Sequence, residues 1–378
     1  MKNFTGKKKW IVIGLAIALA VLLCVAVVLT ILGGNKEQPP VETTVATTTQ
    51  ATTVETTVET TVETEPPVIY RNPLTGEVLE EAFTGRVAAV VVNNLKAALP
   101  QYGISQADII YEFEAEGGVT RFLALFTDLS NVEQVGPIRS VRSYFNNIAA
   151  AFDAPIVHCG GSVTGRKGHY DYENKLENWE HVDQSYNGGY FFRDEDRYYN
   201  QGYNWEHTLF AKGPKLLEAF KKNNINMVNE EGVDNGFVFD EAAAVTGEDA
   251  KKITVKFLGT KTTTMTYDET AGKYMAEEYG SPLIDGQTDE QVGFDNVLVI
   301  LADQTKKVIR STQLSFYDMI GEGDGYIAID GKMAQIKWSR KTVEDPFVYT
   351  YADGTPVAFK VGTTYTAVID FEGSVTCE

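Results

Sequence analysis

The sequence contains few of the residues that most often mark a chemical site. Among 378 residues there are three cysteines and four histidines, and one cysteine, Cys24, lies inside an apolar run. The other two, Cys159 and Cys377, allow a single bridge, which excludes a disulfide scaffold. No histidine stands in an H-E-x-x-H or Cys-x-x-Cys pattern and no EF-hand spacing is present, so we predict no metal and no cofactor.

Basic residues are also scarce. The chain has 33 Lys and Arg against 52 Asp and Glu, a formal net charge of -19. The first 34 residues hold four lysines and no acid, so the remainder carries 29 basic against 52 acidic groups. A surface this acidic repels nucleic acid and anionic lipid. We therefore predict no nucleic-acid partner, and any bound anion requires a local basic pocket.

One long apolar run is present, at residues 10–32, directly after the lysines at 7–9. A run of this length spans a bilayer as a helix, and basic residues before it stay in the cytoplasm. We predict a cytoplasmic tail at 1–9, a transmembrane anchor at 10–32 and an extracellular remainder. A cleaved signal is less favoured because its apolar region would be shorter, and a lipid-modified Cys24 because leucines precede it.

Residues 35–69 are dominated by Thr, Glu and Val, and the unit TTVE occurs three times at 52–63. This composition cannot bury a core, so we predict a disordered stalk that extends the folded part into a cell wall. The alternative is a linker with no particular length requirement.

The folded part begins near residue 70 and is long enough for two domains. Short apolar runs at 86–92, 109–113, 121–126 and 154–158 predict buried strands, and apolar spacing predicts helices at 137–152 and 212–223. We therefore expect an α/β domain with a mixed sheet at 70–230.

The pattern changes after residue 230. Alternating runs separated by Asp-Gly turns predict antiparallel strands at 253–257, 262–267, 296–300, 325–329 and 334–338. Residues 231–378 should form a smaller, mostly antiparallel β-rich domain, so the predicted fold class is α+β.

Several segments in fixed order resemble one family. In the first half these are NPLTG at 72–76, VVNN at 91–94, QADIIYE at 106–112, EGGVTRF at 116–122 and VGPIRSVR at 135–142. In the second half they are residues 274–285, 295–297 and 323–326, then Trp338, Asp345-Pro346 and Asp353-Gly354. Together they resemble the YerB-like predicted lipoproteins of Gram-positive bacteria.

The resemblance implies a two-domain exported protein, and it brings no catalytic residues because the function of that family is unknown. Two departures stand out. The apparent membrane helix replaces the lipid-modified cysteine of the family, and the segment 362–365 reads Gly-Thr-Thr-Tyr where the family has a Gly-Lys-Thr-like turn followed by an aromatic ending.

The first candidate site begins at residues 136–137, where proline after glycine predicts a helix start. Arg139 and Arg142 would lie on one face of its first turn, where free amides already favour negative charge. An anion held between the arginines and the amides explains this placement. The alternative is that the arginines pair with internal acids, among them Glu112, Glu114 and Glu116.

The second candidate is the segment 158–162, a predicted strand end followed by a glycine turn. Gly160, Gly161 and Ser162 would present amides to an oxyanion, with His158 as acid or base. The segment lacks a P-loop lysine and does not match G-x-S-x-G. The alternative is a structural histidine that caps a turn.

The third candidate is the aromatic loop at 193–207, where Arg193, Arg197 and His207 accompany several Tyr and Trp residues. Rings beside arginines and carboxylates suit a sugar or a peptidoglycan fragment. The alternative is a solvated loop pinned by a few buried aromatic side chains.

Two functions follow from these candidates. One is a noncatalytic envelope module that binds an anionic wall polymer, a peptidoglycan fragment or an envelope protein; its predicted ligand-binding residues are Arg121, Arg139, Arg142, Ser162, Arg193, Arg197 and His207. The other is a hydrolase or transferase acting on a wall polymer, in which His158, Glu112 or Glu116 moves a proton.

Two observations separate these outcomes. Hydrogen bonding of His158 or His207 to Arg139 would favour the enzyme. Pairing of both Arg139 and Arg142 with carboxylates of the chain would count against this site.

Overall fold

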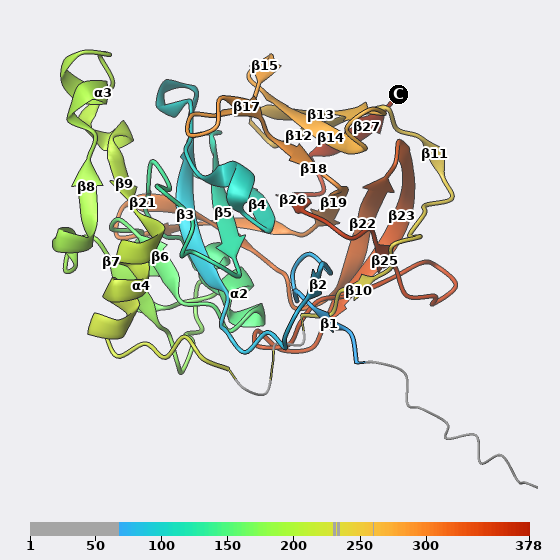
Figure 1. Ribbon diagram of the computed structural model, residues 1–378, viewed down its shortest axis with the longest axis horizontal. Helices are drawn as coiled ribbons and strands as arrows, with labels where there is room; N and C mark the ends of the chain where they lie inside the picture. Colours follow the sequence, from blue (N-terminus) through green and yellow to red (C-terminus); the bar gives the residue numbers. More distant parts are fainter. Residues whose placement is uncertain (1–67, 230–231, 233–234, 260) are drawn as a thin grey trace, which may run out of the picture. The chain divides into compact units, whose positions relative to one another are not determined.

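The apolar run near residue 90 forms the strand β3 (Ala88–Asn94), and all seven of its residues are buried. The computed structural model describes residues 68–229, 232, 235–259 and 261–378 (Figure 1). The predicted tail and anchor, and the predicted stalk up to residue 67, lie outside the described residues. No helix in the described part is long and apolar enough to cross a membrane.

An eleven-stranded mixed sheet forms the centre of the molecule (Figure 1). Ten strands lie side by side in the order β11 (Glu248–Asp249), β23 (Lys332–Arg340), β22 (Gly321–Ile329), β19 (Asn296–Leu301), β26 (Thr364–Ile369), β4 (Ile109–Glu114), β5 (Thr120–Phe126), β3, β6 (Ile156–His158) and β7 (His181–Asp183). The eleventh, β24 (Val348–Thr350), pairs with β23.

Strand β26 joins the two halves of this sheet. It pairs in parallel with β19 on one side and with β4 on the other, with Tyr365 opposite Val297 and Ile110. Strands β3, β6 and β7 are also mutually parallel, whereas β3, β5 and β4 are joined antiparallel. The sheet therefore takes strands from both sides of the predicted boundary near residue 230, and that boundary stays a prediction.

Both faces of the central sheet are covered, which explains why its strands read as continuous apolar runs. On one face, side chains of β3 such as Val91 pack with Phe145 and Ile148 of helix α2 (Ser143–Ala151). On the other face, Val90 belongs to a core that includes Phe220 of helix α4 (Gly213–Lys222).

The second face is also covered by a six-stranded antiparallel sheet. Its strands are β15 (Ser281–Pro282), β14 (Lys273–Glu278), β13 (Thr262–Asp268), β12 (Lys252–Lys256) and β27 (Ser374–Cys377), with β18 (Gly293–Phe294) on β14. Ile253, Met265 and Ala276 enter the same core as Val90.

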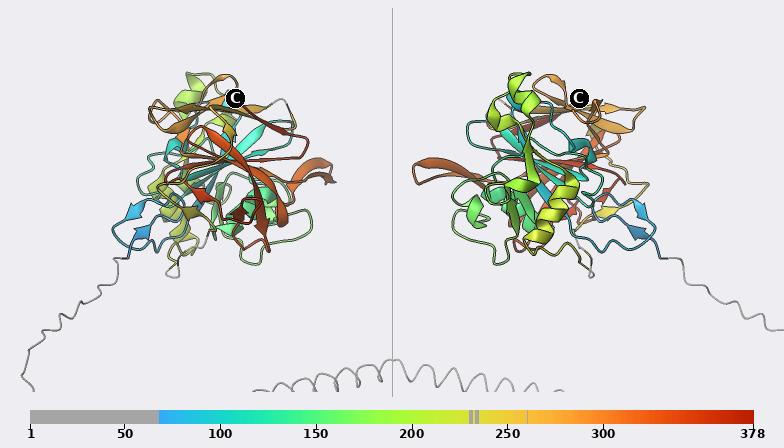
Figure 2. Two further views of the ribbon diagram at one scale, coloured as in Figure 1. Left: turned by 90° about the vertical axis from the view of Figure 1, so that its right-hand side faces the viewer. Right: turned by 60° about the vertical axis from the view of Figure 1, so that its left-hand side comes forward.

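Five two-stranded pairs complete the described strands: β1 (Tyr70–Arg71) with β2 (Val78–Leu79), β8 (Phe191–Arg193) with β9 (Leu209–Ala211), β10 (Val238–Phe239) with β25 (Ala358–Phe359), β16 (Ile284–Asp285) with β17 (Glu290–Gln291), and β20 (Gln304–Ile309) with β21 (Thr312–Tyr317). The β20–β21 hairpin projects from the body in both views of Figure 2. Within the described ranges, one further α-helix, α3 (Glu195–Tyr199), and five 3-10 turns lie in connections.

The predicted fold class is confirmed, since a mixed sheet with few helices precedes a largely antiparallel region. One helix prediction is wrong at its start. Helix α2 begins at Ser143, not at residue 137, and Arg142 is its N-cap with extended backbone angles. Residues before it are extended because Ile138 bridges Val92 and Val141 bridges Gly161. Arg139 therefore does not lie in a helical turn.

A buried trio of charged groups lies between the two sheets. Lys261, directly before β13, places its Nζ 3.1 Å from Glu112 Oε1 of β4 and in contact with the carboxyl group of Glu278 on β14. All three residues are at most 3% exposed. Burial, with repulsion from Glu112, raises the pKa of Glu278 to about 8. Burial opposes the charge on Lys261, but the two acids outweigh it and raise the Lys261 pKa.

The remaining oxygens of the trio are satisfied by hydrogen bonds. Glu112 accepts from Asn94 Nδ2 at 2.9 Å and from the Tyr365 hydroxyl at 2.5 Å, as well as from Thr120 and Thr263. Glu112, a predicted proton donor or acceptor, is thus fully buried, and both of its carboxylate oxygens are bonded to other residues of the protein.

We expect Lys261→Met to destabilise the protein by about 3–5 kcal/mol at pH 7, because two buried carboxyl groups would lose their cation. The loss should grow at pH 9, because the Glu278 pKa of about 8 leaves this carboxyl group ionised there beside Lys261 in the wild type, whereas the variant has no cation for it. Urea unfolding at both pH values measures it. Lys251→Met is the matched control, since Lys251 forms an exposed pair with Glu269 and should leave stability nearly unchanged. Equal stability of Lys261→Met and wild type would contradict the role of the trio.

Candidate functional site

The arginines singled out in the sequence meet around Ser140. The backbone of Arg139 is held between two strands, because its N–H donates to the Val91 carbonyl at 2.9 Å and its carbonyl accepts from Cys159 N–H at 3.0 Å. Arg121 reaches the same place from β5 and donates from Nη1 to the Ser140 carbonyl at 2.9 Å. Arg142 donates to that carbonyl too, at 3.3 Å.

Two of these arginines have carboxylate partners within the chain. Arg142 donates from Nε to both oxygens of Glu116, at 2.9 and 2.8 Å, and its Nη2 lies 2.7 Å from Glu116. The Arg142 contact outweighs burial and lowers the Glu116 pKa. Arg139 Nη2 lies 2.9 Å from Glu206 Oε2. The expected internal pairing therefore occurs at both positions, and this counts against a site built on Arg139 and Arg142, whether it binds or catalyses.

Arg121 differs from both. It is 9% exposed, and among the described residues no carboxylate lies within ion-pair distance of it and the Ser140 carbonyl is its one acceptor. Burial, reinforced by the neighbouring Arg142, lowers the Arg121 pKa to about 10, so the group stays charged at neutral pH. Most N–H groups of Arg121 make no hydrogen bond within the described residues, and the nearby Glu116 acts on its charge only from beyond ion-pair distance.

Two more arginines extend this positive region. Arg139 and Arg193 lie near enough to repel each other, and both act with Arg166 on the Cys159 thiol. Arg166 lies 3.4 Å from Asp183. In the described part of the chain, three of these five arginines have a carboxylate partner, namely Glu116, Glu206 and Asp183. We name this set the arginine cluster: Arg121, Arg139, Arg142, Arg166 and Arg193.

The start of helix α2 borders the same cluster. Its N-cap, Arg142, makes no side-chain cap hydrogen bond, and the Ser143 hydroxyl is buried without a partner among the described residues. Free amides at a helix start favour an anion. Arg142 thus lies at the helix start as its N-cap, but the predicted placement of both Arg139 and Arg142 in the first helical turn is wrong, because the helix begins at Ser143.

His158 is the last residue of β6 and is fully buried. Its Nδ1 lies 2.8 Å from the Gly160 carbonyl, so Nδ1 carries the proton, and Nε2 accepts from His181 Nδ1 at 2.9 Å. Burial, despite the nearby Asp183, lowers the His158 pKa to about 4. Ser162 accepts from Gly165 N–H at 2.9 Å. The hydrogen bonds of His158 to the Gly160 carbonyl and of Gly165 to Ser162 are local, and they stabilise the backbone turn at this end of β6.

His207 is buried and accepts at Nδ1 from Asn93 Nδ2 at 3.0 Å, and burial lowers its pKa. Neither His207 nor His158 forms a hydrogen bond with Arg139 in the described part of the chain. The contact that would favour an enzyme is thus not found there. The described residues also contain no group of three His, Cys, Asp or Glu side chains that could hold a metal ion.

Arg197 anchors the aromatic loop to the body. It is 1% exposed and donates to the carbonyls of Pro100 and Ala98 at 3.0 and 2.8 Å, with its guanidinium 4.1 Å from the Tyr203 ring. Tyr203 also donates to the Leu99 carbonyl at 2.6 Å. These contacts hold the loop against the body of the protein. They also use the guanidinium group of Arg197 inside the protein, so it is not available to a ligand.

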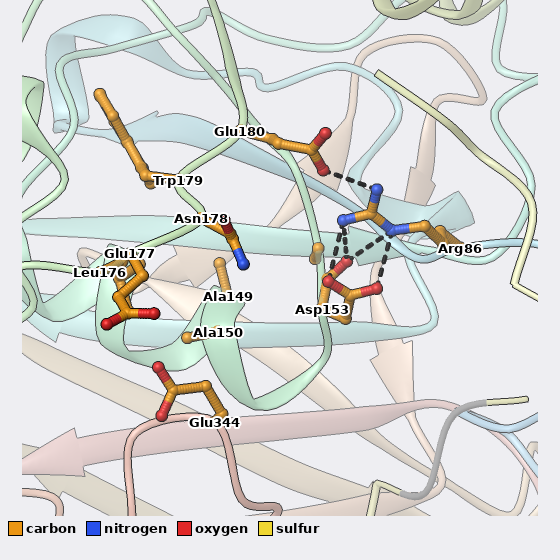
Figure 3. Close-up of a pocket in the computed structure, with 11 residues that line it drawn as sticks. Arg86, Ala149, Ala150, Asp153, Leu176, Glu177, Asn178, Trp179, Glu180 and Glu344 are labelled. Atoms are coloured by element: carbon orange, nitrogen blue, oxygen red, sulfur yellow. Dashed lines mark hydrogen bonds and ion pairs between the residues drawn. The ribbon is translucent and has the colours of Figure 1, made fainter. Parts of the chain in front are cut away.

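A pocket of about 320 Å³ lies elsewhere, between the end of α2 and residues 176–180 (Figure 3). Its arginine, Arg86, is already bound by Asp153 and Glu180, with Nη1 2.6 Å from Glu180 Oε2. Glu177 and Glu344 add further negative charge to the lining. Arg86 thus has carboxylate partners of its own in this pocket, whereas Arg121 has none within ion-pair distance among the described residues.

Sequence reasoning missed Arg166 and the carboxylates of Glu206 and Asp183, whereas Glu116 was among the acids expected to pair with the arginines. Arg166 follows Gly165 in a 3-10 turn, and no pattern in the sequence connects it to Arg139. The residues that approach it come from β7 and from the turn after β6.

Comparisons with known proteins identify the family and the fold to which this chain is similar. Residues 74–226 match the N-terminal domain, and residues 253–366 the C-terminal domain, of the protein family of unknown function DUF3048. The chain is 29% identical over 308 residues to "Putative lipoprotein YerB" of Bacillus subtilis (strain 168), which covers 79% of this chain and 86% of YerB. The crystal structure of Bacillus subtilis YerB superposes with a TM-score of 0.67 at 27% identity and covers 81% of this chain and 99% of that one.

We expect the His158 and His181 pair to make stability depend on pH. The His158 pKa is lower in the folded protein than in the unfolded chain, so only the unfolded chain takes up the proton as pH falls below about 6.5. His158 should therefore cost about 2 kcal/mol of stability between pH 7 and pH 5.

Urea unfolding of wild type and His158→Asn at both pH values tests this, since asparagine keeps a donor for the Gly160 carbonyl. The variant should lose less stability on acidification than the wild type. An unchanged difference between the two pH values would refute the assignment.

Proposed function

The chain belongs to the DUF3048 family, and from this premise we propose that it is a noncatalytic module of the cell envelope that binds an anionic ligand at the arginine cluster. The name of YerB as a lipoprotein supports an extracytoplasmic, envelope-associated protein. The apolar run at 10–32 supports anchoring by a membrane helix in this chain.

The observation that carries the proposal is the state of Arg121. Its guanidinium is nearly buried and has no carboxylate partner among the described residues, whereas Arg86, Arg139 and Arg142 each have one. A guanidinium grips a carboxylate or a phosphate through two N–H groups at once. A ligand anion there would supply the partner that the protein omits, with the amides at the start of α2 beside it.

The charge of the rest of the chain shapes this binding. At a formal net charge of -19 the protein repels polyanions at long range, so binding depends on short-range contacts to the cluster. Such contacts weaken as salt increases. The histidines support binding over catalysis, because His158 and His207 are held neutral by burial and bonded to other residues.

We expect Arg121→Gln to weaken binding of a poly(glycerol phosphate) polymer by roughly 10- to 100-fold, the value of one or two hydrogen bonds to a charged group. Isothermal titration calorimetry with the full-length protein measures it, and the same samples assayed for released fragments report any turnover. Lys341→Gln removes the same charge from an exposed turn and should leave binding unchanged.

Equal affinity of wild type and a folded Arg121→Gln variant would refute the site. Release of polymer fragments that depends on Arg121 would replace the binding module by an enzyme acting on the same polymer.

A further inference from the structure

The strongest remaining surface feature is a group of exposed aromatic rings beside the arginine cluster. Tyr199 is 71% exposed, Trp205 47% and Tyr198 39%, although the molecule buries most of its large side chains. The rings contact each other edge to face, with centroids 4.9 Å apart for Tyr198 and Tyr199 and 5.2 Å apart for Tyr198 and Trp205. We name these three residues the aromatic platform.

The fold holds the aromatic platform in place. It belongs to residues 194–208, which connect β8 to β9 and include α3, at the left of Figure 1. Asp194 caps α3 by accepting from Arg197 N–H, and the Arg197 side chain fixes the loop to the carbonyls of Ala98 and Pro100. The exposed rings are therefore presented by an anchored loop, so little conformational entropy is lost when a ligand binds.

The aromatic platform is continuous with the arginine cluster. The Arg193 guanidinium lies 4.9 Å from the centre of the Trp205 ring and donates to the Trp205 carbonyl at 2.5 Å. The next residue, Glu206, pairs with Arg139, which neighbours Arg121 and Arg193 in turn. A polymer lying across this surface would meet rings first and guanidinium groups next.

This adjacency selects the chemical class of ligand. Sugar rings present C–H faces that stack on Trp and Tyr, and their hydroxyl groups bond to polar edges. A simple polyanion such as polyphosphate has no apolar face and gains nothing from the aromatic platform. The exposed carboxylate of Glu206 between the two groups accepts hydroxyl hydrogens, which also suits a sugar.

We propose that the ligand is an anionic glycan, whose sugar rings stack on Trp205 and the adjacent tyrosines while its phosphate or carboxylate groups bind the arginine cluster. This inference rests on the proposed function, and it specifies that the anionic ligand also contains sugar rings. The aromatic platform supplies the preference for a glycan, and Arg121 supplies the requirement for charge.

The test compares two probes on the full-length protein: a phosphorylated mannan fragment and a linear polyphosphate of equal charge. The wild type should bind the mannan fragment more tightly. Trp205→Ala should weaken mannan binding roughly tenfold and change polyphosphate binding less than twofold, because only the sugar stacks. Trp205→Phe should restore most of the mannan affinity, and Arg121→Gln should weaken both probes.

Phe371→Ala serves as the matched control, since Phe371 is an exposed ring of the turn before β27 and should change neither affinity. An unchanged urea midpoint for Trp205→Ala shows that the loop still folds. If Arg121→Gln weakens both probes while Trp205→Ala weakens neither, the glycan inference is wrong and the anion site stands. If the wild type binds neither probe, both proposals fail.

Discussion

The buried ion trio at Lys261 is the interaction on which the geometry of the arginine cluster depends. Lys261 and Glu278 belong to the second sheet and Glu112 to the central one, so their contact fixes the two sheets against each other. Beside it, Gly259 N–H donates to Glu114 Oε2 at 2.8 Å, and Gly259 and Gly118 approach so closely that a Cβ on Gly259 would lie 2.8 Å from the Gly118 backbone. The trio thus positions the β4–β5 turn, where Glu116 neutralises Arg142. Arg121, five residues later, is left without such a partner.

The arrangement of the strands follows largely from the sequence, because a strand covered on both faces must be apolar throughout. The runs at 86–92, 109–113 and 121–126 have this property and form β3, β4 and β5. Helix α4 is equally clear, since its proline stands at the first turn and Leu216 and Phe220 lie on one face. The sequence does not reveal which backbone segments pair when they lie far apart in the chain. Residues 138–142 resemble the first turns of a helix, but bridges to Val92 and Gly161 hold them extended.

The candidate site shows the same limit. Spacing suggested that Arg139 and Arg142 act together, and the structure places both beside Ser140 with Arg121. Which of them carries an unpaired charge depends on Glu116 and Glu206, whose positions come from two separate loops. Lys261 is a stronger example. A lysine beside a threonine-rich strand gives no sign of burial, and its partner Glu112 is about 150 residues away in the chain.

The position of β26 has a consequence for how the protein is made. Thr364 pairs with Ile109 on one side and Asn296 on the other, so the central sheet closes only when the last residues of the chain arrive. A chain synthesised in the order of its sequence leaves the edge of β4 unpaired until then, and unpaired edges recruit other strands. Long-range parallel pairing also folds slowly. The interval between the synthesis of β4 and that of β26 is therefore the time when the β4 edge is most open to pairing with a wrong strand.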